Sequence, residues 1–132
     1  MTVQWRGDES ITVGGHADLD AVLDAIERDT PPDRPVLVSV IHPMGNCLTI
    51  GLGGSLSVLT SVPADGNPPY FTSLGDVARG EPGAEESVVF FYHDHWSEFS
   101  RYQCLVPAIA RKAMRDFFQT GELPQWLHWE EE

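Results

Sequence analysis

Two segments of the chain have the 3.6-residue periodicity of amphipathic helices. In residues 17–29, apolar positions recur at i, i+3, i+4 and i+7, and the Thr30-Pro31-Pro32 sequence ends the pattern. A second predicted helix covers residues 107–120, because Pro107 suits the first helical position and Gly121 suits the C-terminal cap. The predicted buried stripe of this second helix consists of Ala110, Ala113, Met114 and Phe117.

The remaining apolar positions follow the patterns of β-strands. Residues 36–41 form a short run rich in Val and Ile, and residues 47–52 alternate between apolar and small or polar types. Residues 88–92 are the most hydrophobic run of the chain and are expected to form a central strand. Further extended segments are expected at residues 1–13 with a polar turn at 7–9, at 56–62, at 70–72, and at 126–129 before an acidic tail at 130–132.

The order of these elements predicts an α+β fold. Consecutive strands that are joined by short turns pair antiparallel. We therefore expect a twisted antiparallel sheet of about six strands, with the two helices packed on one face, in a single domain covering residues 1–132. The polar residues 75–86, rich in Gly and Pro, are expected to form a surface loop.

Composition narrows the classes of function. Twenty acidic residues against eight basic ones give a net charge of −12, which argues against binding to nucleic acid or to an anionic membrane. The charge is compatible with a basic protein partner, and solubility alone explains it equally well. No apolar run is long enough to span a bilayer and no N-terminal signal pattern is present, so we expect a cytoplasmic protein.

The sequence carries little that predicts catalysis. His93 and His95 have the spacing of ligands on one face of a strand, but a zinc site needs three or four convergent ligands and no spacing supplies the others. No nucleophile motif is present, and Cys47 and Cys104 are expected to be buried thiols. We therefore expect neither an enzyme nor a cofactor. A small metal-dependent enzyme that uses His93 and His95 remains an alternative.

Aromatic residues crowd the segment 90–102. Alternation along a strand lets only about half of them face one core, so the rest are covered by the second helix or lie at the surface. Exposed Trp and Tyr beside carboxylates are typical of protein interfaces. Both interpretations, core and contact surface, remain open from the sequence.

Three blocks of the chain resemble a known family. They are residues 65–76 (DGNPPYFTSLGD), residues 88–99 (VVFFYHDHWSEF), and the segment from Leu105-Val106-Pro107 through FFQTGELP at 117–124 to Trp129. Together they are similar to the immunity proteins of bacterial polymorphic toxin systems, and most closely to the first-numbered immunity family. The resemblance covers roughly residues 35 to 130.

The resemblance implies an α+β fold, no catalysis and tight inhibition of a cognate toxin domain. It also implies a toxin class, a nucleic-acid cytidine deaminase, which would need a basic substrate groove. An acidic inhibitor fits such a groove by charge and holds it through aromatic anchors. A regulatory module with a partner other than a toxin is a further alternative.

We selected candidate contact residues by residue type and expected exposure. They fall into an acidic loop, a segment after the hydrophobic run, and a second patch. The loop contributes Glu81, Glu85 and Glu86; the segment contributes Asp94, His95, Trp96, Glu98 and Phe99; the patch contributes Asp65, Asn67 and Tyr70.

Overall fold

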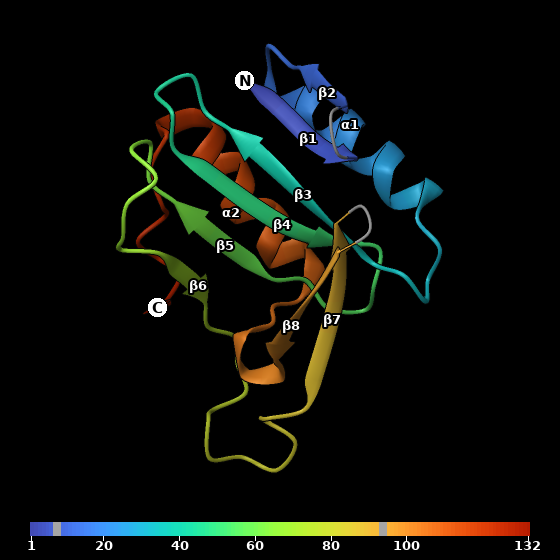
Figure 1. Cartoon of the computed structure of the whole chain (residues 1–132), viewed down its shortest axis with the longest axis vertical. Helices are drawn as coiled ribbons and strands as arrows, with labels where there is room; N and C mark the ends of the chain where they lie inside the picture. The colour runs from blue at the N-terminus through green and yellow to red at the C-terminus, as the bar shows by residue number, and fades with distance from the viewer. Residues whose placement is uncertain (7–8, 93–94) are drawn as a thin grey trace.

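The computed structural model describes residues 1–6, 9–92 and 95–132 (Figure 1). Over these residues the chain forms nine strands, two α-helices and one short 3₁₀ helix. In chain order they are β1 (Thr2–Arg6), β2 (Glu9–Thr12), α1 (His16–Asp29), β3 (Val36–Ile41), β4 (Cys47–Leu52), β5 (Leu59–Val62), β6 (Phe71–Ser73), β7 (Ser87–Tyr92), β8 (His95–Ser100), η1 (Arg101–Gln103), α2 (Pro107–Thr120) and β9 (Trp129–Glu131).

The main sheet has the order β2-β1-β3-β4-β5-β6-β9, and each neighbouring pair is antiparallel. The predicted α+β class is confirmed. The expected number of strands, about six, is wrong over the described residues, where nine strands form. The segment predicted as extended contains two strands, β1 and β2, and the polar segment His95–Ser100 forms a strand of its own. Of the turn predicted at 7–9, residues 7–8 lie outside the described residues and Glu9 begins β2.

Both helices cover the same face of the sheet, where the main core lies (Figure 1). Alternation in β4 directs Leu48, Ile50 and Leu52 into this core, and each of them is at most 1% exposed. Helix α1 adds Leu19, Leu23 and Ile26, and α2 adds the predicted stripe of Ala110, Ala113, Met114 and Phe117. Pro107 begins α2, and Gly121 caps it in the left-handed conformation with φ of 75°, as the sequence predicted.

An ion-pair cluster joins the two helices at the side of the core. The guanidinium of Arg111 on α2 lies 2.8 Å from Asp24, 3.4 Å from Asp20 and 3.7 Å from Glu27, all on one stripe of α1. Arg115, one turn further along α2, pairs with Asp20 at 3.2 Å. The side chain of Arg111 is only 12% exposed, so it bridges the helices rather than facing solvent.

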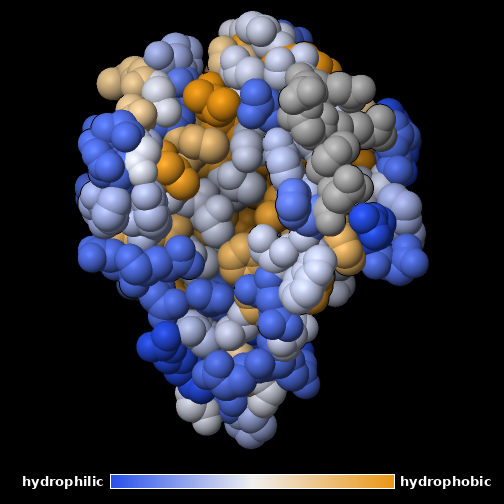
Figure 2. All heavy atoms as spheres, in the orientation of Figure 1, coloured by the Kyte–Doolittle hydropathy of each residue, from blue (hydrophilic) through white to orange (hydrophobic). Residues whose placement is uncertain are grey.

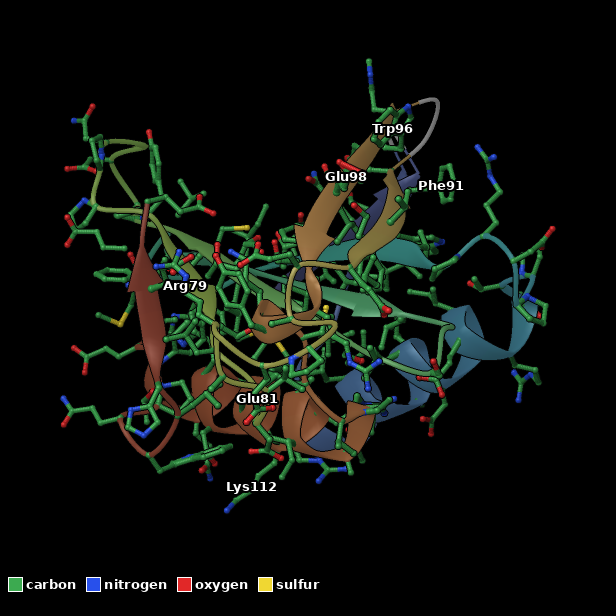
Figure 3. All side chains as sticks on the ribbon, turned by 90° about the horizontal axis from the view of Figure 1, so that it is seen from below. Arg79, Glu81, Phe91, Trp96, Glu98 and Lys112 are labelled. Carbon is green, nitrogen blue, oxygen red and sulfur yellow. The ribbon has the colours of Figure 1, made fainter. Side chains whose placement is uncertain are left out.

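Strand β7 is not the central strand that its hydrophobicity predicted. It meets the main sheet at a single parallel position, Val36↔Phe91, where the Phe91 N–H donates to the Pro35 carbonyl at 2.8 Å. Its main partner is β8, with which it forms an antiparallel hairpin of six residue pairs. We call the described residues of this hairpin, 87–92 and 95–100, the arm; it projects from the face opposite the helices (Figure 3).

Apolar side chains of β7 form part of a second, smaller hydrophobic core under the arm. Phe90 is fully buried there with Leu37 and Val58, and Phe99 of β8 packs edge-on against Phe90 with ring centroids 6.0 Å apart. Gly51 of β4 lies beneath the Phe90 ring, and a Cβ at that position would collide with the ring. Because Gly51 has no side chain, the Phe90 ring of the arm can pack directly on β4 at this position.

The C-terminal residues are also part of the sheet. The expected strand at 126–129 begins instead at Trp129, and it pairs with β6 through Glu131. Glu130 forms a 2.7 Å ion pair with Arg79, and the Thr72 hydroxyl donates to Glu132 at 2.5 Å. The acidic tail expected at 130–132 is thus held in and beside an edge strand, because its carboxylates find partners on the neighbouring elements.

Replacing Phe117 with Ala should lower the free energy of unfolding by about 3–5 kcal/mol, because the ring is 1% exposed in the main core. Gln119→Ala, at an exposed position of the same helix, should change it by less than about 0.5 kcal/mol. Urea unfolding measures both. A Phe117→Ala protein as stable as the control would show that α2 does not dock through this ring.

Gly51→Ala should destabilise the protein by about 1–3 kcal/mol, because the new methyl group displaces the buried Phe90 ring. Gly54→Ala is the matched control, since a Cβ there would meet its nearest atoms at an ordinary 3.5 Å. Thermal melting of the two variants beside the parent makes the comparison. Equal melting temperatures for the two variants would mean that the arm does not rest on this glycine.

Candidate protein-binding surface

The arm presents two aromatic side chains on its outer face. Alternation along β7 sends Phe90 into the small core and Phe91 to the opposite side. Trp96 of β8 lies directly across from Phe91 in the hairpin register and is 62% exposed. Figure 3 shows Trp96 at the outer end of the arm, far from the helices. The crowded aromatics therefore divide between core and surface.

The other candidates from the segment 94–99 take different positions. Glu98 is exposed and forms no ion pair with any described residue. His95 is exposed as well, whereas Phe99 is half-buried against Phe90 and supports the arm from inside. Asp94, like His93, lies outside the described residues. Trp96 and Glu98 are thus the two candidates whose side chains lie together on the outer face.

The acidic loop lies at the opposite end of the arm from Trp96. Glu85 and Glu86 immediately precede β7 and reach the end of β8, where Glu86 lies 3.7 Å from Arg101 and Ser100 Oγ lies 3.5 Å from Glu85. Both pairs are exposed and loose, so they contribute little to stability. Glu81 is exposed further along the same loop, well away from Trp96 (Figure 3).

The second patch, Asp65 with Asn67 and Tyr70, is not joined to the arm. It forms the turn between β5 and β6, at the side of the molecule away from the arm (Figure 1). Its polar groups serve the turn itself: Asp65 accepts from the Asn67 N–H at 2.9 Å, and the Tyr70 hydroxyl donates to the Gly66 carbonyl at 2.6 Å. The structure therefore separates this patch from the other candidates.

A groove that the sequence did not predict begins beside Phe91. It has a volume of about 500 Å³ and is lined by Trp5, Ile11, Ala21, Val22, Ala25, Ile26, Asp29, Thr30, Pro31, Arg34, Val36 and Phe91. The Arg34 guanidinium lies 4.3 Å from the centre of the Phe91 ring at one end. The adjacent Phe90-Phe91 pair is the signal that could have found it, because two neighbouring residues of one strand must face opposite sides.

The remaining surface is strongly polar. Figure 2 shows apolar side chains in the hollowed middle of this face and hydrophilic residues at the lower end, where the loop before β7 lies. Arg79, Arg101, Arg111 and Arg115 are each within ion-pair distance of a carboxylate. Half of the eight basic residues are thus partly neutralised by internal partners, and the excess of 12 negative charges dominates the exterior.

The described residues offer little for metal or thiol chemistry. Among them, no three His, Cys, Asp or Glu side chains come close enough to hold a metal ion, and His93 is not described. Burial raises the pKa of the Cys104 thiol to about 11, and burial also raises the pKa of Cys47. Both thiols are protonated at neutral pH, which makes them weak nucleophiles. Neither described helix is long and apolar enough to cross a bilayer.

Comparison with known proteins adds one finding to this surface. A search of curated proteins returns no match. The family model described as "Immunity protein Imm1" matches residues 7–131, which is nearly the whole chain and includes every element from β2 to β9. The chain belongs to the Imm1 family of immunity proteins.

Proposed function

We propose that this protein binds a cognate toxin domain and blocks it, so that the cell that makes the toxin survives. The observation that carries the proposal is the Imm1 family match over residues 7–131, since immunity against a toxin is what the family name describes. The surface supports the same conclusion, because the described residues form an exposed Trp96, a half-buried Phe91 beside it and a largely apolar groove.

The toxin that we propose is a cytidine deaminase that acts on nucleic acid in the cytoplasm. Such an enzyme needs a cationic groove for the phosphate backbone of its substrate. A protein of net charge −12 is attracted to that groove and competes with the substrate for it. The deaminase class follows from the resemblance of the sequence blocks, and the charge supports any toxin with a basic substrate site.

The arm is the proposed centre of the contact. Trp96 supplies a large exposed anchor, Phe91 continues the aromatic surface into the groove, and Glu98 adds an exposed charge beside them. His95 and Asp94, which lies outside the described residues, are further proposed contacts, and Phe99 packs against Phe90 inside the arm. Glu81, Glu85 and Glu86 steer the basic partner from the base of the arm, and Asp65, Asn67 and Tyr70 form a separate proposed contact.

Co-expression with the toxin domain encoded by the neighbouring gene tests the function. Cells that carry the toxin domain alone should stop growing, and cells that also make this protein should grow and yield a co-purifying complex. Uracil accumulation in DNA or RNA reports the deaminase class. Growth arrest despite full expression of this protein would contradict immunity. Growth arrest by the toxin domain alone without any uracil signal would contradict only the deaminase assignment.

Trp96→Ala should weaken binding of the toxin domain about 30- to 1,000-fold, chiefly by faster dissociation, because exposed central aromatics anchor interfaces. Trp126→Ala is the matched control: Trp126 is 43% exposed, and its Nε1–H donates to Asp116 of α2 rather than contacting the arm's aromatics. Surface plasmon resonance gives the rates, and circular dichroism verifies folding. Unchanged binding by a folded Trp96→Ala protein, or a larger loss of affinity in the Trp126 variant, would show that the arm is not the centre of the interface.

A further inference from the structure

Strand β8 has one free edge. Over the described residues β8 pairs only with β7, so its second edge faces away from the sheet. In an antiparallel hairpin, alternate residue pairs exchange backbone hydrogen bonds while the pairs between them point their N–H and C=O groups outward. The Arg101 N–H donates to the Glu86 carbonyl at 2.9 Å, which fixes which pairs are bonded.

This register identifies the outward-pointing residues of β8. Counting by two from the Glu86–Arg101 pair, the bonded pairs involve Phe99, Ser97 and His95. The backbone groups that point outward therefore belong to Ser100, Glu98 and Trp96. The Phe91 N–H, which belongs to the pair opposite Trp96, also points away from the hairpin and donates to Pro35, as this alternation requires.

Only part of the outer edge is closed by the protein itself. The Ser100 N–H donates to Gln103 Oε1 at 2.9 Å, and the Cys104 thiol approaches the Ser100 carbonyl at 3.7 Å. The N–H and C=O groups of Trp96 and Glu98 have no partner among the described residues. The open part of the edge therefore offers two N–H donors and two C=O acceptors, and it lies directly beside the exposed Trp96 ring.

The open edge lacks the usual protection of free strands. Proteins guard such edges with Lys, Pro, bulges or short length, because unpaired backbone groups attract other strands. Strand β9, an edge of the main sheet, carries two glutamates in three residues. Strand β8 is six residues long, has a regular register, contains no Lys or Pro, and has Glu98 as its one acidic residue. An edge with one charged side chain, Glu98, beside an exposed aromatic fits strand addition by a partner.

We propose that the toxin domain adds an extended segment to the edge of β8, hydrogen-bonded to the backbone of Trp96 and Glu98; this rests on the proposed function. The incoming segment places an apolar side chain against Trp96 and a basic one near Glu98, since opposite charges stabilise neighbouring strands. A second copy of this chain is the less favourable occupant, because two molecules of charge −12 repel each other and a cationic partner is attracted.

Glu98→Pro tests the backbone contact. The substitution removes an N–H that points away from β7, and Pro is tolerated where the N–H side of an edge strand faces solvent. Glu98→Ala is the matched control, because it removes the same carboxylate and keeps the N–H. With the inactive toxin domain as the probe, Glu98→Pro should bind about 10- to 100-fold more weakly than Glu98→Ala, since a partner carbonyl is left without its donor. Both should melt near the parent temperature.

Amide hydrogen exchange in the parent protein gives an answer even if Glu98→Pro does not fold. The amides of Trp96 and Glu98 should exchange quickly in the free protein and become protected in the complex. Equal binding by folded Glu98→Pro and Glu98→Ala, or fast exchange at both amides in the complex, overturns strand addition and leaves the immunity function intact. A parent that forms a dimer through this edge, detected by sedimentation, also overturns it. No binding by the parent removes the proposed function and this inference together.

Discussion

The structure depends on burial of the β3–β4 pair on both of its faces. Val38 and Val40 of β3 face the helices, while Leu37, which precedes Val38 and alternates with it, faces the arm, and all three are less than 10% exposed. A strand pair buried on both sides needs a cover on each side. The helices α1 and α2 cover one face, and the arm, seated on Gly51, covers part of the other. Two helices cover one face, whereas the arm covers only part of the other, so the arm projects from that second face (Figure 3).

The small second core leaves the arm exposed for binding. The arm is held mainly by Phe90 and Phe99 on one side and by a single parallel position at Val36, while Phe91 on the other side contacts Arg34. Trp96 and Phe91 are left on the outer side, and the outer edge of β8 is left open. An arm whose base is packed against a core and whose Trp96 is exposed is well suited to holding a partner with little reorganisation.

Charge and aromatic surface have separate roles in this arrangement. The ion pairs of Arg111 and Arg115 join α1 to α2, and Arg79 is taken up by Glu130 at the sheet edge. Half of the eight basic residues therefore have carboxylate partners within the protein, and the net charge of −12 speeds the approach of a basic partner. The arm then determines how the approached partner is held, because apolar anchors act mainly on dissociation.

Local patterns determined the elements, and tertiary packing determined their use. The periodicity of residues 17–29 and 107–120, the cap at Gly121 and the alternation of residues 47–52 were sufficient to predict both helices, the buried stripe of α2 and strand β4. The sequence alone could not place β7, because hydrophobicity reports that a strand is buried and not which strands lie beside it. The sequence analysis also missed β8, because this strand is mostly exposed and its residues are mostly polar. It could not decide that Phe90 lies in the small core and Phe91 in the groove. Those assignments depend on contacts between residues as distant in the chain as Gly51 and Phe90, which only the folded chain brings together.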